Sequence, residues 1–587
     1  MQPIPRACRT RISARLFLEP TIDEVFWRTD VRDNFTVIRG KHTIKAGGEW
    51  VHSNNTQVFR GFFKGLYFFD NAVGFMHYVT NGPTVQECAN GRYVVPPVTC
   101  ASVGSTFDFG PLFLFLQHGP ATQGESFDQS GASSINNNEF ALFVQDTWKV
   151  TRNLTVNLGL RWEAQHFPSM TIAPSQTAYG LNLSDPKFPS DGTLHNQNKM
   201  FQPRVGFAWD TRGNGKSALR ASWGIFNARQ NMLTQVGAIT TNGVQQQSFA
   251  AGSAFGTPPV FGQNAGPISN PPPAGTPPPP GVNVTFFSKD YANPRIYTTN
   301  VGYEQEILAG WAGYVDLTLS KGVHLTRFIM PNVCCSTADL IPSVDVNLGN
   351  GPSYTGPVPF PNLGNLTTDT ASSAKSLYRG ATVGVRKRFS NRFQLDANYV
   401  WSEDLDDDSN ERDPFSFRYY DLYNLAKEYS YSDRDEKHKF NLVTHADLPW
   451  KVALDVRMQA HSAQPYSANP TVVGVNGVGP GPLCSNTEAG HRVQIGLGPG
   501  GTNVDCGRNF LRKDNGYFAF NFGASRPLHL GERFQIIPKV EVFNLFNNKN
   551  NINTISGSGT PLFDFDGFIR QGVGDPREAQ LSIRLQF

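Results

Sequence analysis

Residues 154–163 read Leu-Thr-Val-Asn-Leu-Gly-Leu-Arg-Trp-Glu, so apolar and polar side chains alternate along the whole stretch. Side chains of a β-strand point to opposite faces with a period of two, which makes one face apolar and the other polar. The apolar face carries Leu154, Val156, Leu158, Leu160 and Trp162, and the polar face carries Thr155, Asn157, Gly159, Arg161 and Glu163. The stretch predicts a strand that is longer than the roughly five or six residues of ordinary soluble strands.

The same alternation returns at residues 393–402, 452–459 and 579–587. A tilted strand needs about 9–11 residues to cross a bilayer, which is close to the length of these stretches. The composition of 44 Phe, 56 Gly and 41 Pro also favours strands separated by turns. Alternation alone does not show which face is inside, because a soluble sandwich and a membrane barrel produce the same pattern with opposite faces.

The lengths of the connections favour the membrane barrel. Short turns are predicted at residues 151–153, 211–215, 309–310, 390–391, 449–450 and 528–531, and they alternate with long connections such as residues 465–515. This places all short turns at one rim and all long loops at the other, as in outer-membrane barrels with short periplasmic turns and long extracellular loops. We expect an all-β transmembrane antiparallel barrel with about sixteen visible strands, the first at Asn34–Gly40.

Hydropathy and charge exclude two other classes of protein. No apolar run approaches the ~20 residues of a membrane-spanning helix, and the longest obvious run is only Pro111 to Leu116. Mean hydropathy of -0.34 is compatible with a barrel, because only alternate residues face lipid. The net charge of +3 gives no reason to expect a nucleic-acid partner.

The first residues do not resemble the rest of the chain. Arg6, Arg9, Arg11 and Arg15 form a basic stretch that no apolar signal-peptide core follows. Either the protein is cytosolic or the true N-terminus is missing, and we favour the second interpretation. Residues 1–33 are therefore assigned to a divergent or spurious segment, and residues 34–587 to the barrel.

Cysteines and tryptophans mark loops and strand ends. Cys88 with Cys100, and Cys484 with Cys506, lie in Gly/Pro/Asn-rich sequence where each pair is able to close a loop disulfide, although unpaired loop thiols fit equally well. The spacing of these cysteines does not favour a zinc site.

Four tryptophans fall at predicted strand ends, namely Trp148, Trp162, Trp401 and Trp450. Aromatic girdles at the membrane interface explain these positions, and so does ordinary packing.

No motif indicates an enzyme, a cofactor or a dedicated metal site. One acidic run offers oxygen ligands for Ca²⁺, but solvated carboxylates in an extracellular loop are the favoured interpretation; the run consists of Asp404, Asp406, Asp407, Asp408, Glu411 and Asp413. The polar faces of the strands supply candidates that line the lumen, namely Arg161, Glu163, Asp396, Asp455 and Arg457. They are expected to contact substrate, to solvate the wall or to contact a plug.

Several motifs resemble TonB-dependent outer-membrane receptors. One hairpin of that family resembles residues 139–148 (EFALFVQDTW) together with 153–161 (NLTVNLGLR). Its next two strands resemble residues 203–209 and 218–226, and motifs near the end of such barrels are similar to residues 433–440 and 542–547. The resemblance is to the Oar-like subgroup and covers roughly Asn34 to Phe587. The terminal Phe587 also resembles the signal by which outer-membrane proteins are recognised for assembly.

The resemblance implies a protein of the bacterial outer membrane with about 22 strands, preceded by a signal peptide, a TonB box and a plug domain. None of these three N-terminal features is recognisable, so we expect a truncated gene product or fragment whose upstream DNA encodes a plug in some reading frame. The implied partners are outer-membrane lipid, the assembly machinery, and a small-molecule, glycan or peptide ligand. The TonB system is a partner only if a plug is present.

The favoured function is the barrel portion of a transporter for energy-coupled uptake. Two alternatives stay open: a free-standing porin of about sixteen strands with passive diffusion, and a soluble or surface-attached β-sandwich adhesin. If the apolar face contacts lipid, replacing Leu158 with arginine is expected to block assembly, because an arginine at mid-bilayer costs about 2–4 kcal/mol.

Overall fold

The computed structural model of the chain describes most of the sequence. The described residues are 22–69, 72–88, 90–105, 111–251, 259–332, 358–364, 367–408, 425–466, 509, 511–512, 515–531, 533–551 and 574–587. Within these ranges, no helix combines the length and the apolar character needed to cross a membrane.

One large antiparallel sheet dominates the fold. Its fifteen long strands are β1 (Ile22–Arg39), β2 (His42–Phe59), β7 (Ala132–Lys149), β8 (Leu154–His166), β9 (Gln197–Trp209), β10 (Ser217–Asn227), β13 (Arg295–Leu308), β14 (Trp311–Ile329), β15 (Thr368–Ser390), β16 (Phe393–Asp406), β18 (His438–Leu448), β19 (Val452–His461), β22 (Tyr517–Ser525), β24 (Phe534–Phe543) and β25 (Glu578–Gln586). Three short strands, β12 (Thr285–Phe287), β17 (Ser430–Tyr431) and β23 (Leu528–Leu530), complete the 18-stranded sheet. The predicted long antiparallel strands are confirmed.

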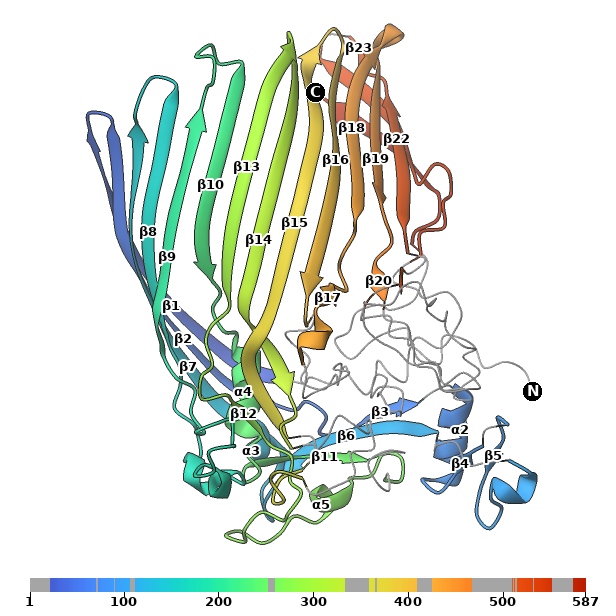
Figure 1. Cartoon of the computed structure of the whole chain (residues 1–587). Coiled ribbons are helices and arrows are strands. Elements are labelled where there is room, and N and C mark those ends of the chain that lie inside the picture. The colour runs from blue at the N-terminus through green and yellow to red at the C-terminus, as the bar shows by residue number, and fades with distance from the viewer. Residues whose placement is uncertain are drawn as a thin grey trace, which may run out of the picture.

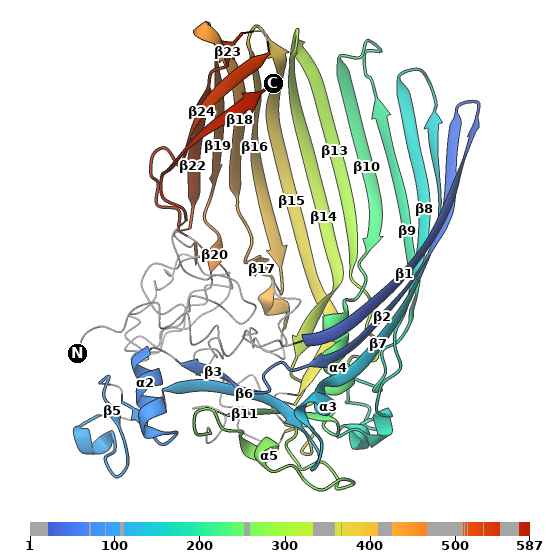
Figure 2. The ribbon, with the colours of Figure 1, turned by 180° about the vertical axis from the view of Figure 1, so that it is seen from behind.

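Each long strand pairs with the next long strand along the chain, from β1 to β25. The sheet curves strongly, and β1 and β25 lie at its two margins (Figures 1 and 2). Among the described residues, no pairing joins β25 to β1. Fifteen long strands are therefore described, against about sixteen expected.

The remaining elements lie in the connections. They are β3 (Leu66–Phe69), α2 (Ala72–Asn81), β4 (Gln86–Glu87), β5 (Tyr93–Val94), η1 (Ala101–Val103), β6 (Leu112–Pro120), α3 (Phe127–Gly131), η2 (Pro174–Gln176), η3 (Gly180–Asn182), α4 (Met232–Thr240), β11 (Gln246–Ala251), α5 (Gly266–Ser269), η6 (Leu425–Glu428), η7 (Pro449–Lys451), β20 (Pro465–Tyr466) and β21 (Leu511–Arg512).

Short and long connections alternate along the meander, as predicted. The short ones are residues 40–41, 150–153, 210–216, 309–310, 391–392, 449–451 and 526–533, and they lie at the end of the sheet where the chain also ends, at the top of Figure 1. The long ones begin after β2, β8, β10, β14, β16, β19 and β24, at strand ends that point to the opposite end of the sheet. We call these two ends the turn rim and the loop rim.

Backbone conformation explains the tight turns. Gly310 closes the β13–β14 hairpin with φ of 78°, a left-handed conformation that glycine adopts without steric cost. Asn391 and Arg392 also have positive φ, at 50° and 69°, as a two-residue hairpin with the twist of its strands requires. The turn predicted at residues 528–531 is wrong in one respect: β23 continues to pair with β24 there, and the chain turns only after Leu530.

The two faces of the sheet differ in chemistry, and the division follows the sequence alternation. Across β7 and β8, Val144 lies opposite Leu160 and Leu142 lies opposite Trp162, so these apolar side chains share one face. That face is open: Leu142 is 60% and Leu160 is 46% exposed, whereas Glu163 on the other face is buried. We call the apolar face the outer face and the polar face the inner wall.

Strand β1 extends the sheet beyond the expected domain boundary. It begins at Ile22, so the boundary placed between residues 33 and 34 falls inside this strand. Residues 22–33 pair with β2 in unbroken register from Ile22–Phe59 to Asp33–Gly48. Val25, Trp27 and Val31 share one face of this part of the strand, and the charged Glu24, Arg28 and Asp30 share the other, which is the sequence signal for it.

At the loop rim, parts of two long connections form a separate small sheet. Strand β6 pairs with β3 from the same connection and with β11 from the connection after β10. Its core is aromatic, with Tyr67 packed against Phe115 at a ring-centroid distance of 4.7 Å. Figure 1 shows this loop sheet beneath the long strands at the loop rim.

A disulfide closes the hairpin beside this loop sheet. Cys88 and Cys100 are bonded, which confirms one of the two predicted pairs, whereas Cys484 and Cys506 lie outside the described residues. Both bonded cysteines are buried with Val94.

Removing this disulfide is expected to destabilise the hairpin locally. A crosslink over a sequence separation of 12 restricts the unfolded chain by about 3 kcal/mol. Replacing both Cys88 and Cys100 with alanine should therefore speed amide exchange in residues 86–104 by roughly 100-fold. Exchange in the long strands should not change, and reductant should have no added effect on the variant; equal exchange with and without the crosslink would contradict the prediction.

Candidate functional site on the inner wall

Three neighbouring strands bring glutamates together on the inner wall. Glu49 of β2 and Glu163 of β8 both lie opposite Ala141 of β7, so the three residues form one row across the sheet. Glu139 stands two residues further along β7 on the same face. The small, buried Ala141 side chain leaves space between the carboxylates of its neighbours.

Arg161 bridges two of these glutamates. Its Nε donates to Oε1 of Glu163 at 2.7 Å, and its Nη2 donates to Oε2 of Glu49 at 3.0 Å. Both carboxylates are nearly buried, where an unpaired charge would be costly. The two predicted lumen residues Arg161 and Glu163 thus contact each other.

A second arginine reaches the cluster from a long connection. Arg229 follows β10 in the chain, and its Nη1 lies 2.5 Å from Oε2 of Glu139. Its Nη2 lies 3.6 Å from Glu163 and 3.9 Å from Glu49. Three carboxylates from three strands therefore surround one guanidinium group. We call Glu49, Glu139, Arg161, Glu163 and Arg229 the wall cluster.

Sequence reasoning missed three members of this cluster. Glu139 stands at the start of the stretch 139–148, where its place on the polar side of the alternation was a usable signal. Glu49 lies in a strand that the sequence indicated only weakly, because Gly47 and Gly48 interrupt its alternation. Arg229 lies in a loop without periodicity, and no local pattern places it on the wall.

Two other predicted residues form separate ion pairs. Asp396 of β16 accepts a hydrogen bond from Arg386 of β15 at 3.0 Å, and both side chains are about half exposed. Asp455 of β19 lies 2.7 Å from Nδ1 of His445, close to the turn rim. These pairs are distant along the sheet from the wall cluster, since they occupy β15–β16 and β18–β19.

The last two predicted residues have exposed positions. Arg457 lies on β19 opposite Val443 and Asn521. Phe587 follows the last residue of β25 and is 96% exposed. The structure leaves this terminal side chain accessible at the turn rim.

The acidic run after β16 differs from the expectation of solvated carboxylates. Asp404 and Asp406 belong to β16, and Asp407 forms an ion pair of 2.6 Å with Arg327. Both partners are at most 5% exposed, and the backbone N–H of Lys375 also donates to Asp407 at 2.7 Å. The expectation was wrong for Asp406 and Asp407 because tertiary contacts bury them; Glu411 and Asp413 lie outside the described residues. Within the described ranges, no group of three potential ligands is arranged to hold a metal ion.

The four singled-out tryptophans lie toward both rims. Trp148 stacks on His42 near the turn rim at a centroid distance of 5.4 Å, and Trp450 in η7 is 81% exposed. Trp162 and Trp401 lie nearer the loop rim, and Trp162 donates to the carbonyl of Asn198 on the neighbouring strand. This arrangement is the one expected of aromatic girdles.

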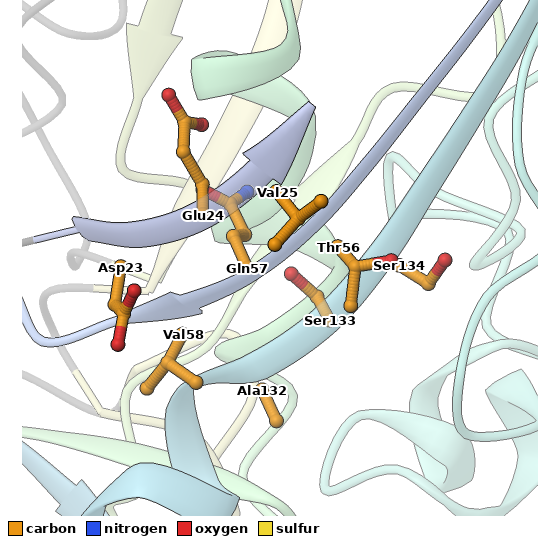
Figure 3. Close-up of a pocket in the computed structure, with 9 residues that line it drawn as sticks. All are labelled: Asp23, Glu24, Val25, Thr56, Gln57, Val58, Ala132, Ser133 and Ser134. Carbon is orange, nitrogen blue, oxygen red and sulfur yellow. The ribbon is translucent and has the colours of Figure 1, made fainter. Parts of the chain in front are cut away.

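A hollow of about 470 Å³ lies at the margin of the sheet, where β1, β2 and β7 approach the loop rim (Figure 3). Each of the three strands contributes three lining residues, for example Val25, Thr56 and Ser134 in one row. Most of these side chains are small, and Figure 3 shows the carboxylates of Asp23 and Glu24 directed away from each other. The hollow therefore lacks the convergent polar groups of a ligand site.

Two titratable groups of the loop sheet region have shifted pKa values. Burial lowers the pKa of His118 in β6 from 6.5 to about 4, and burial raises the pKa of Glu125 from 4.5 to about 7. Both shifts favour the neutral form, as desolvation does in general.

Acidification is expected to destabilise the loop sheet through His118. Between about pH 6.5 and 4, His118 binds a proton in the unfolded chain but not in the folded one. The free energy of unfolding of the loop sheet therefore decreases as the pH falls through this window, by up to about 3 kcal/mol. Glu125 acts in the opposite direction, since its contribution is present below pH 4.5 and is lost as the pH rises through 7. Amide exchange in β6 measured against pH, with and without His118→Gln, checks this. A wild-type profile identical to that of the variant would contradict it.

Comparison with known proteins places this architecture. A family model described as outer membrane beta barrel domain matches residues 23–580. Similar solved structures include the outer membrane transporter YddB from Escherichia coli (10% identity, TM-score 0.47, 96% of this chain and 54% of that chain). Another is the FrpB iron transporter from Neisseria meningitidis (10% identity, TM-score 0.46, 96% of this chain and 55% of that chain). A third is the ferripyoverdine receptor of Pseudomonas aeruginosa (10% identity, TM-score 0.45, 96% of this chain and 48% of that chain). The chain spans about half the length of each of these structures. A search of curated proteins found no match.

Proposed function

Since this chain belongs to the outer-membrane β-barrel domain family, we propose that it forms the barrel wall of a TonB-dependent transporter of the Oar-like subgroup. Its location is the bacterial outer membrane, and barrels of this family are typically transporters and not enzymes. The proposed activity is energy-coupled uptake of a small-molecule, glycan or peptide ligand.

The observation that carries the proposal is the hairpin of β7 and β8. Residues 139–161, whose sequence resembles the TonB-dependent receptors, form this hairpin in register from Asn138–His166 to Lys149–Thr155. The same hairpin presents an apolar row to the outer face and supplies Glu139, Arg161 and Glu163 to the inner wall. The motif and the polar lining of a transport path thus coincide.

The proposal gives the wall no covalent chemistry and no cofactor. In the proposed transporter, the TonB system is a partner only when a plug is present. Assembly machinery would recognise the exposed terminal Phe587. The long connections at the loop rim, including the disulfide-closed hairpin, would face the extracellular side and bind the ligand.

A passive porin is the second candidate. It is favoured by one observation, the segment after β10 that packs against the inner wall, because a segment folded into the lumen narrows a diffusion path. In that case the chain would need neither plug nor energy.

Conductance of the purified chain in a planar bilayer separates the two candidates. The described edges β1 and β25 do not pair, so we expect the chain alone to give no steady open pore. A steady pore insensitive to any added plug segment would favour the porin and overturn the transporter proposal. Sequencing the genomic DNA upstream of Met1 provides an independent test, because the transporter proposal expects a plug-encoding frame there.

A further inference from the structure

Residues 228–241, which follow β10, lie against the inner wall. We call them the inner segment. Its helix α4 begins after Asn231, whose side chain accepts from the backbone N–H of Thr234 at 2.9 Å. Val236 and Ile239 of α4 pack against the fully buried Ile135 of β7, which belongs to the same face as Glu139. Both views show α4 on the concave side of the sheet at the loop rim (Figures 1 and 2).

Hydrogen bonds hold the inner segment at two places on the sheet. The backbone N–H of Gln230 donates to Oε1 of Gln165 in β8 at 3.0 Å, and Nε2 of Gln165 donates to the carbonyl of Gln230 at 3.1 Å. The side chain of Gln230 accepts from the hydroxyl of Tyr291 and from that of Thr326 in β14. Gln230 alone thus contacts both β8 and β14, although β9, β10 and β13 lie between these strands in the order of the sheet.

The position of Arg229 in this segment has an electrostatic consequence. Its guanidinium group is 30% exposed, while the three surrounding glutamates are 10–14% exposed, so Arg229 is more accessible than the carboxylates it contacts. Arg32 of β1 also pairs with Glu49, at 3.0 Å, so three arginines face the three glutamates with Arg229 and two without it. Loss of the cation at position 229 therefore makes this part of the wall more negative by one charge.

We propose that the inner segment is a fixed constriction of the transport path and that Arg229 limits the passage of cationic solutes through it. This inference rests on the proposed transport function and names a residue that determines its charge specificity. The paired hydrogen bonds at Gln165 and the buried contacts of α4 make the constriction a permanent part of the wall.

Thiol labelling of the wall beyond the constriction tests the inference. Asn157 lies on the inner wall, four residues nearer the turn rim than Arg161, and is exposed. The full chain carrying Asn157→Cys is produced in intact cells and labelled with a membrane-impermeant thiosulfonate, in one experiment cationic and in the other anionic. The labelling rate of the chain without Asn157→Cys is subtracted from each measured rate. Adding Arg229→Gln should raise the cationic-to-anionic rate ratio about fivefold, the effect of removing one charge within several ångströms in a partly aqueous site.

Two further variants make the outcome decisive. Arg229→Lys keeps the charge and should restore the wild-type ratio. Arg220→Gln removes an arginine from the same wall, where Arg220 pairs with Glu304 at 3.3 Å on β10 and β13, and should change the ratio less than twofold. An unchanged ratio in Arg229→Gln, equal effects of Arg229→Gln and Arg229→Lys, or no labelling of residue 157 in any variant would overturn the inference. Labelling needs no energy coupling, so a failure of the transporter proposal would appear in the conductance experiment and not in this ratio.

Discussion

Replacing Leu160 with arginine is expected to destabilise the assembled sheet by about 2–4 kcal/mol, because it places a charge on the lipid-facing row at mid-depth. Along β8, Val156 lies opposite Trp148 near the turn rim, and Ala164 lies opposite Phe140, which pairs with Trp50 nearer the loop rim. Leu160 is midway between these aromatic levels. Its cross-strand neighbours are Val144 and Pro203, which offer no counter-charge.

The sequence had pointed to Leu158 for the same experiment, and the structure predicts a smaller effect there. Leu158 lies directly opposite Asp146, which forms a 2.6 Å pair with His42 on the outer face. An arginine at position 158 is therefore within reach of a carboxylate, whereas one at position 160 is not. The order of effects should be Leu160→Arg, then Leu158→Arg.

Asn157→Arg is the matched control for both variants. It adds the same side chain to the same strand, but on the exposed inner wall, where water and polar neighbours accept a charge. Folding is measured by urea titration in lipid vesicles. If Asn157→Arg proves more harmful than Leu160→Arg, the assignment of the outer face is wrong.

Replacing Asp407 with alanine is expected to destabilise the loop-rim ends of β14, β15 and β16 by about 3–5 kcal/mol. The change removes the carboxylate that lies 2.6 Å from Arg327, which is 1% exposed, and loss of one partner of a buried ion pair has a high desolvation cost. It also removes the acceptor of the Lys375 backbone N–H. Amide exchange at these strand ends should increase by at least 100-fold.

Asp396→Ala provides the comparison. It breaks the Arg386–Asp396 pair, whose side chains are 54% and 46% exposed, and such exposed pairs contribute about 0–1 kcal/mol. A double variant that replaces Arg327 with methionine and Asp407 with leucine should recover most of the lost stability, because neither charge of the buried pair remains. Equal effects of Asp407→Ala and Asp396→Ala would show that burial of the Arg327 pair does not matter.

The sheet was largely predictable because its signals are local. Alternation at residues 154–163 identified β8 and both of its faces, and the turn residues between strands identified the rims. The same signals failed where local order was weak. Residues 22–33 were separated from the barrel although they belong to β1, and the acidic residues after β16 were placed in solvent.

The candidate site was predictable only in part. Arg161 and Glu163 were found because they share a strand and a face, and side chains two residues apart on one strand face remain neighbours in any fold that keeps the strand. Glu49 joins them through the register of β2 with β7, and that register depends on the whole sheet. The hydrogen bond between Arg161 and Glu49 spans 112 positions of sequence.

Period-two alternation acts over neighbouring residues, so the amino-acid order alone established long strands, an apolar face, a polar face and two unlike rims. The partners of buried charges depend instead on where distant segments meet. Arg229 reaches Glu139 across 90 positions because the connection after β10 turns back onto the sheet. Arg327 of β14 reaches Asp407, directly after β16, across 80 positions because β15 brings these strand ends together. No local pattern specifies such a return path, which is why the wall cluster and the buried pair emerged only from the folded chain.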